Sequence, residues 1–295
     1  MRPHLYATSH VGPLDHGNSH AQILLDENHV AWVVKSLASA QQGPTRGRAL
    51  FNDYVATRVA ELLNLPVPQV SVILVEDVLL DAFPTLRTQA FGTFTPGFHL
   101  AIRYHQGVTL RDFRSAGLSS LADRRVVNKL AANAVVTFDT WTCNPDRAVE
   151  TDLGLYENEG NLLFETSRPG ELRLMMLDQG QAFAGDWHDQ PDGNPFSRLG
   201  AWPLRLMGHL NLFVRGRWLD LESCLEYVSH IQHVPLVDLR SIVHEVPWAW
   251  REGISEAEIE ELLLYLIRRA AHLEKPMYQE LTALPERMHA RRRLT

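Results

Sequence analysis

The apolar pattern changes character part-way along the chain, and this change constrains the fold more than any other feature. In about the first hundred residues, short β-rich apolar runs surround one segment with helical spacing. After about residue 196 the spacing is mostly helical, and the clearest helix runs over residues 255–273, where Ser255 and Glu258 form a capping box. We therefore predict an α+β fold, with a small part over residues 1–107 and a larger part over residues 108–295.

Within the small part, four segments have patterns that predict individual elements. Residues 21–37 contain two apolar runs around a polar turn, which predicts a β-hairpin. Residues 49–64 have apolar side chains at helical spacing, and Pro66 ends the helix. Residues 70–78 and 98–104 predict two further strands.

The larger part divides into three stretches. A helical stripe covers residues 121–138, residues 139–185 read as loops and short strands, and residues 196–295 read as mostly helical. Apolar residues make up 45% of the chain, which is enough to build a core for both parts.

Charge and cysteine usage exclude several classes of protein. The chain has 28 Lys and Arg against 35 Asp and Glu, a net charge of −7, so nucleic acid is not an expected direct partner. The two cysteines, Cys143 and Cys224, are too few and too far apart for a multi-cysteine zinc site or a disulfide scaffold, and they fit a reducing cytoplasm. No apolar stretch is long enough for a membrane helix, and the N-terminus lacks a signal peptide pattern.

Two aspartates follow elements that would deliver them to loops. Asp146 follows the turn signal Asn144-Pro145 after the predicted helix, and Asp178 ends the apolar run Leu174–Leu177. Either aspartate alone is typical of a turn or a helix cap. Brought together, they would suit one base or orienting carboxylate and one metal ligand.

A lysine and a third aspartate complete this set. Lys35 ends the apolar strand 31–34, where an edge lysine would ordinarily extend its amine to water. Asp53 lies near the start of the predicted helix 49–64, where an acidic charge is favoured in any case. A strand lysine, a helix acid and two later loop aspartates are, however, the working set of a kinase, and they occur here in that order.

On these segments the sequence resembles the HipA-like kinases, in particular the compact branch that lacks the HipA N-terminal extension. The resemblance spans about residues 11–190 and rests on four segments: VAWVVKSL around Lys35, FNDYVATRVAELLNLPVP, FDTWTCNPDR and LMMLDQGQAF. It implies a bilobed protein-kinase-like fold, with a β-rich N-lobe, a mostly helical C-lobe, and ATP and magnesium between them.

The resemblance also implies roles for individual residues. Lys35 resembles the lysine that contacts the nucleotide phosphates, and Asp53 lies where the family usually has the glutamate that pairs with that lysine. Asp146 resembles the catalytic-loop aspartate, and Asp178 resembles the aspartate that binds magnesium.

Two further nucleotide contacts follow from position in the resemblance. Residues 15–21 correspond to the loop that covers the phosphates, although Gly17 is its one glycine. The hinge that meets adenine is expected near residues 102–105, with Ile102 and Tyr104 as contacts.

The catalytic loop departs from the family pattern. The family usually has an asparagine five residues after the catalytic aspartate, as a second metal ligand, and here that position is Thr151. Asp152 could serve instead, since a carboxylate suits a hard cation. Gln179 and Gln181 replace histidines of this branch and cannot be protonated.

Three functions are compatible with these residues. The first is an ATP- and magnesium-dependent serine/threonine protein kinase, and the second is a small-molecule kinase of the aminoglycoside-phosphotransferase type. The third is a pseudokinase that binds nucleotide and acts as an interaction module, which Thr151, the short Asp53 side chain and the glycine-poor loop favour. HipA relatives often occur with a partner protein, so a protein partner is possible here as well.

Overall fold

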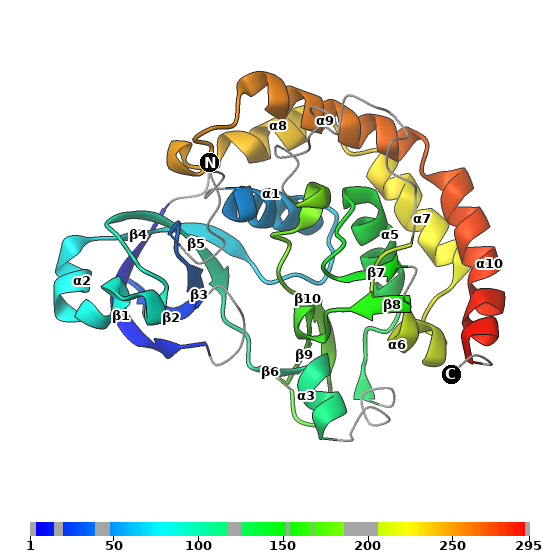
Figure 1. Ribbon diagram of the computed structural model, residues 1–295, viewed down its shortest axis with the longest axis horizontal. Helices are drawn as coiled ribbons and strands as arrows, with labels where there is room; N and C mark the ends of the chain where they lie inside the picture. Colours follow the sequence, from blue (N-terminus) through cyan, green and yellow to red (C-terminus); the bar gives the residue numbers. More distant parts are fainter. Residues whose placement is uncertain are drawn as a thin grey trace.

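The computed structural model describes residues 4–14, 20–38, 48–116, 125–151, 154–166, 168–185 and 206–292. Its N-terminal part is a closed barrel with the strand order β1-β2-β3-β5-β4, shown in blue and cyan in Figure 1. The strands pair antiparallel except β1 and β4, which run parallel. The barrel strands are β1 (Leu5–Pro13), β2 (Gln22–Asp26), β3 (Ala31–Lys35), β4 (Val70–Val75) and β5 (Gly97–Arg103).

The barrel has its own apolar core. Alternate residues of β2 and β3 point inward, so Leu24, Trp32 and Val34 are buried together. Helix α2 (Asp77–Ala82) closes one end with Leu79 and Leu80. The predicted hairpin and both predicted strands are present, but β4 ends at Val75 rather than residue 78, because α2 begins at Asp77.

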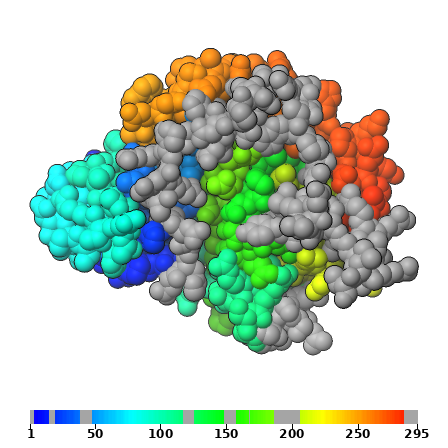
Figure 2. Space-filling model, viewed as in Figure 1, coloured from blue at the N-terminus to red at the C-terminus, as the bar shows by residue number. Residues whose placement is uncertain are grey.

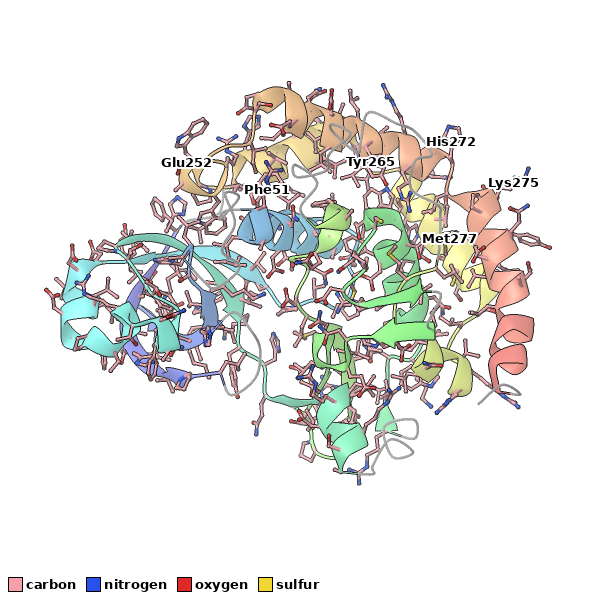
Figure 3. All side chains as sticks on the ribbon, in the orientation of Figure 1. Phe51, Glu252, Tyr265, His272, Lys275 and Met277 are labelled. Atoms are coloured by element: carbon pink, nitrogen blue, oxygen red, sulfur yellow. The ribbon has the colours of Figure 1, made fainter. Side chains whose placement is uncertain are left out.

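Helix α1 (Arg48–Leu62) is held by the C-terminal part of the chain as well as by the barrel. Tyr54 donates to Glu245 over 2.9 Å, and the Trp250 ring meets the Tyr54 ring edge-on. The Trp250 indole also donates to the carbonyl of Phe98 in β5 over 2.9 Å. In Figure 3, Phe51 of α1 lies below the arch that α8 (Leu236–His244) and α9 (Glu256–Ala271) form. One core cluster accordingly contains α1, the outward face of β4 and β5, and the C-terminal helices.

The C-terminal part combines small sheets with helices. A three-stranded sheet has the order β10-β9-β6, and β7 pairs with β8 in a hairpin. These strands are β6 (Gly107–Thr109), β7 (Ala148–Thr151), β8 (Gly154–Glu157), β9 (Leu162–Glu165) and β10 (Arg173–Met176). Its further helices include α3 (Leu110–Ser115), α5 (Ala131–Thr142), α6 (Leu210–Arg215), α7 (Leu221–Gln232) and α10 (Glu274–Arg292).

Two predicted helices have different outcomes. The predicted helix 121–138 has the wrong bounds, because residues 126–130 form a bridge and a turn and α5 starts at Ala131; residues 121–124 lie outside the described part. The capping box of Ser255 and Glu258 is confirmed at the start of α9, where each residue's side chain accepts a hydrogen bond from the other's backbone. The fold is therefore a β-rich barrel followed by a mostly helical region. In the space-filling view of Figure 2, the cyan and blue N-terminal part and the orange and red C-terminal part lie on different sides of the molecule. Within the described residues, no helix has the length and apolar character to cross a membrane.

Candidate active site

Lys35 is the centre of a three-residue charge cluster at the rim of the barrel. Its Nζ lies 2.8 Å from Asp53 Oδ2 and 2.8 Å from Asp178 Oδ1. The Lys35 side chain is only 13% exposed, so its amine does not extend into water as an edge lysine would. Asp53 lies in the second turn of α1 and is 1% exposed, so it is not a solvated charge at the helix start. Residues 143 positions apart in sequence therefore meet at one ammonium group.

The cluster is electrostatically coupled. Burial alone would lower the pKa of Lys35, but the carboxylates of Asp178 and Asp53 outweigh it and raise this pKa above its ordinary value. Removal from water would raise the pKa of Asp178, but Lys35 outweighs that effect and lowers it. For Asp53, burial raises the pKa while Lys35 opposes the shift. Lys35 is thus a fixed cation, and Asp178 is held ionised.

The loop after β10 presents the Asp178 carboxylate. Asp178 has a left-handed backbone, φ 52°, which turns the chain sharply out of the strand. The next two backbone amides are used at the site, since Gln179 donates to Asp53 Oδ1 over 2.8 Å and Gly180 donates to Asp178 Oδ1 over 3.3 Å. A Cβ atom on Gly180 would lie 3.2 Å from Asp178 Oδ1, so a glycine suits this turn. Asn52 of α1 donates to the carbonyl of Gly180 over 3.2 Å and thereby fixes the loop to the helix.

Asp146 is held by two asparagines. Asn161 Nδ2 donates to Asp146 Oδ2 over 2.8 Å, and Asn158 Nδ2 donates to the same oxygen over 3.2 Å. From the described residues, no hydrogen bond reaches the other carboxylate oxygen, Oδ1. Asp146 is half-buried, and a carboxylate oxygen can accept the proton of a hydroxyl group.

Arg147 connects the Asp146 loop to the Asp178 loop. Its guanidinium donates to the carbonyl of Leu177 over 2.7 Å, and Leu177 directly precedes Asp178. It also donates to the carbonyl of Asn161 and forms an ion pair of 2.8 Å with Asp139 of α5. Burial raises the pKa of Asp139 to about 6, and Arg147 opposes this shift. The two loop aspartates predicted from the sequence are therefore tied to one framework.

The asparagines at Asp146 were not identified from the sequence. The expected position five residues after Asp146, Thr151, lies at the end of β7 in the hairpin. The hairpin β7-β8 separates Asp146 from Asn161, which directly precedes β9. Counting five residues from Asp146 therefore does not reach Asn161, because the hairpin β7-β8 lies between the two residues. One sequence signal could have drawn attention to Asn161. It directly adjoins the apolar run Leu162–Phe164, just as Asp178 directly adjoins the apolar run Leu174–Leu177.

The structure describes some of the remaining predicted site residues and leaves others outside its described part. Gly17 and Asp152 lie outside the described residues. Ile102 is in β5 with 8% exposure, and Tyr104 follows β5 in the connection that leads to β6. The chain thus passes from the barrel to the second sheet at Tyr104. Gln179 accepts from Asn144 Nδ2 over 3.0 Å, so a neutral amide is accommodated where a histidine was expected.

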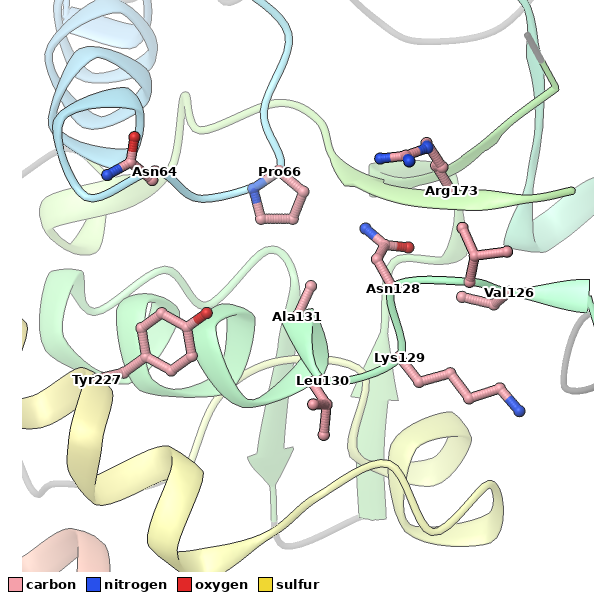
Figure 4. Close-up of a pocket in the computed structure, with 10 residues that line it drawn as sticks. Asn64, Pro66, Val126, Asn128, Lys129, Leu130, Ala131, Arg173 and Tyr227 are labelled. Atoms are coloured by element: carbon pink, nitrogen blue, oxygen red, sulfur yellow. The ribbon is translucent and has the colours of Figure 1, made fainter. Parts of the chain in front are cut away.

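Two other features lie apart from this cluster. Cys143 is buried, and burial raises the pKa of its thiol to about 11, so the thiol is not activated. A pocket of about 660 Å³ opens between the end of α1, the start of α5, β10 and α7 (Figure 4). Its lining contains none of the predicted site residues; it consists of Asn64, Pro66, Val126, Val127, Asn128, Lys129, Leu130, Ala131, Arg173 and Tyr227.

The donor chemistry of the cluster fits a magnesium ion. Asp178 and the Asn161 amide offer oxygen atoms, the ligand type that magnesium prefers, and magnesium usually needs only one or two carboxylates beside phosphates and water. Among the described residues, His, Cys, Asp and Glu form no group of three or more arranged to hold a metal by themselves.

Comparison with known proteins identifies the fold and the family. The crystal structure of the Helicobacter pylori proinflammatory kinase CtkA is similar over 94% of this chain and 98% of that chain, with a TM-score of 0.59 and 16% identity. The Golgi casein kinase with Mn/ADP bound is similar over 93% of this chain and 72% of that chain, with a TM-score of 0.45 and 10% identity. No curated protein sequence matches. The likeness to CtkA shows a protein-kinase-like fold. The model of the HipA-like kinases matches residues 10–194, more than half of the sequence, and the chain therefore belongs to the HipA-like kinase family.

Proposed function

We propose that this protein is an ATP- and magnesium-dependent phosphotransferase that acts on serine or threonine hydroxyls of a protein. The observation that carries the proposal is the bridge of Lys35 to Asp53 and Asp178, with Asp146 tied to the same loop system through Arg147. A kinase requires these parts together, because phosphoryl transfer depends on positioning and on charge neutralisation.

Each group has a distinct role in the proposal. Lys35 binds the nucleotide phosphates, and Asp53 orients Lys35. Asp178 and Asn161 hold magnesium, which neutralises phosphate charge when bound. Asp146 accepts the proton of the acceptor hydroxyl at Oδ1, while the two asparagines hold its other oxygen. Asn161 replaces Thr151 and Asp152 as the proposed second metal ligand.

Two features weigh against a pseudokinase. The Asp53 side chain is shorter than a glutamate, yet it reaches Lys35 at 2.8 Å. Asn161 supplies an amide oxygen near Asp146 despite the threonine at position 151.

The proposal also includes two nucleotide contacts that rest on position in the chain. The hinge near Ile102 and Tyr104 contacts adenine, and Gly17 contacts the phosphates. A cytoplasmic setting is also part of it, supported by two buried thiols without a disulfide.

The proposal is tested by nucleotide binding and by transfer, measured on the same variants. Wild type should show a thermal shift with ATP or ADP that magnesium enlarges, because a ligand that binds only the folded state stabilises it. Asp178→Asn should lose the magnesium-dependent part of that shift. Asp146→Asn should keep the shift and lose transfer of radiolabelled γ-phosphate to itself or to a generic protein acceptor. Asp81→Asn, a change at a 75% exposed carboxylate of α2, is the matched control and should behave as wild type.

The possible outcomes separate the candidate functions. A magnesium-independent shift without transfer would favour the pseudokinase. Transfer to aminoglycosides or other small alcohols, but not to proteins, would favour the small-molecule kinase. No shift with any nucleotide at millimolar concentration would refute the proposal.

A further inference from the structure

Arg147 is fully buried and contacts three separate segments of the chain. Its side chain and that of its ion-pair partner Asp139 are both 0% exposed. Asp139 belongs to α5, whereas the other two acceptors are the backbone carbonyls of Asn161 and Leu177. The Leu177 amide in turn donates to the Asn161 carbonyl over 3.1 Å. One guanidinium therefore fixes the residue before Asp178 against Asn161.

The segment of Arg147 itself and two of the segments that it contacts, those of Asn161 and Leu177, carry the oxygen atoms of the candidate site. Arg147 is the chain neighbour of Asp146, Asn161 bonds Asp146, and Leu177 is the chain neighbour of Asp178. The distance between the Asp178 carboxylate and the Asn161 amide consequently depends on the Arg147 contacts. A guanidinium can make such contacts in several directions at once, because its donors form a rigid planar fork, whereas a lysine offers a single nitrogen.

Stability alone is a poor explanation of this arrangement. Buried ion pairs are often replaceable by apolar residues without loss of stability, because desolvation offsets the attraction between the charges. Here the pair is also incompletely satisfied, since Arg147 Nη2 and Asp139 Oδ1 find no hydrogen-bond partner within the described residues. Such orphaned buried atoms cost free energy. What the pair provides instead is a fixed geometry at two carbonyl groups.

We propose that Arg147, held in place by Asp139, is a positioning residue that sets the metal affinity of the site by fixing Asp178 relative to Asn161. This inference rests on the proposed function. Arg147 contacts neither nucleotide nor acceptor in it, and it acts through the two backbone carbonyls. Loss of the Arg147 side chain should therefore weaken metal binding more than it weakens the metal-free binding of the nucleotide phosphates to Lys35.

The test measures ADP affinity by calorimetry with and without manganese, which reports on binding rather than activity. Arg147→Lys keeps the charge and loses the fork. A second variant, Arg147→Met with Asp139→Leu, replaces both buried charges by apolar groups and so guards against loss of folding. Arg269→Lys is the matched control, because Arg269 is also buried and donates to a backbone carbonyl of α5, that of Thr140 over 2.8 Å.

Both Arg147 variants should raise the apparent dissociation constant for manganese at saturating ADP at least about tenfold, as loss of outer-shell contacts does at metal sites. Their metal-free ADP affinity should stay within about twofold of wild type, and Arg269→Lys should change neither constant. An unchanged manganese constant in either folded Arg147 variant would overturn the inference. So would an equal loss of metal-free ADP binding, because it would indicate general disorder of the site. Absence of metal-dependent binding in wild type would instead overturn the proposed function, and this inference with it.

Discussion

Replacement of Lys35 by methionine should destabilise the folded protein, in addition to abolishing phosphate binding. Asp53 is 1% exposed and would lose the ammonium that lies 2.8 Å from its carboxylate. Removal of one partner of a buried ion pair typically costs about 3–5 kcal/mol, because the remaining charge stays buried without compensation. We expect a value of about 3 kcal/mol at pH 8, near the lower end of that range. Asp178 is 43% exposed and can be solvated, and Asp53 still accepts from the Gln179 amide.

The free energy of unfolding that Lys35→Met loses should become smaller as the pH falls. In Lys35→Met the folded-state pKa of Asp53 is raised by burial with no cation to oppose it. A carboxyl group whose folded pKa exceeds its unfolded value, near 3.9, binds more protons in the folded state, so acid stabilises the folded form. The penalty is therefore complete above the folded pKa and is relieved as the pH falls through it toward the unfolded value.

Urea unfolding followed by tryptophan fluorescence at pH 8 and pH 5 measures the difference in free energy of unfolding between wild type and Lys35→Met. The control is the double variant Lys35→Met with Asp53→Asn, in which neither partner of the ion pair carries a charge and the introduced amide oxygen can still accept from the Gln179 amide. It should recover most of the lost free energy of unfolding, to within about 1 kcal/mol of wild type. A single variant that is as stable as wild type at pH 8, or a double variant that is no more stable than the single one, would refute the reasoning.

Three further substitutions test other parts of the structure. Trp250→Ala should lower the free energy of unfolding by about 3–5 kcal/mol, because it removes a 0% exposed indole from the contact between α1 and the C-terminal helices; a loss below about 1 kcal/mol in urea unfolding would contradict this packing. Asn161→Leu should weaken manganese binding in the presence of ADP at least about tenfold in calorimetry, and unchanged binding would remove Asn161 from the metal site. Burial lowers the pKa of His99 to about 4, so its contribution to stability is complete above pH 6.5 and is lost as the pH falls toward 4, at up to about 1.4 kcal/mol per pH unit. His99→Gln should flatten that part of the stability profile measured by urea unfolding, and an unaltered slope would exclude His99 as its source.

The residues of the charge cluster were predictable from sequence because each follows a strong local signal. Lys35 ends an apolar strand, Asp178 follows the apolar run that contains another strand, and Asp53 lies within an apolar helical stripe. The order of these elements then suffices to suggest that they meet. Hairpin β2-β3 was predictable for the same reason, since its pairing is local along the chain.

Contacts across the fold were not predictable in this way. Asn158 and Asn161 look like ordinary turn residues until the hairpin β7-β8 is formed, because the hairpin returns them to Asp146. Strand β1, with the sequence LYATSHVGP, has no regular apolar alternation, and its first residues pair with β4, 68 positions later in sequence, so its own pattern gives little signal. The buried pair of Asp139 and Arg147 is likewise invisible without knowledge of what surrounds it.

The barrel has its own apolar core, and Lys35 stands on its rim, whereas Asp53 and Asp178 belong to elements outside that core. Two separately filled cores can open as separate cooperative units, and each unit protects its own amide hydrogens from exchange. A molecule that contacts Lys35 and Asp178 together would bridge the two units and would slow the opening of the barrel. Amide exchange in β2, on the side of β3 away from β5, would then report occupancy of a site that β2 itself need not touch.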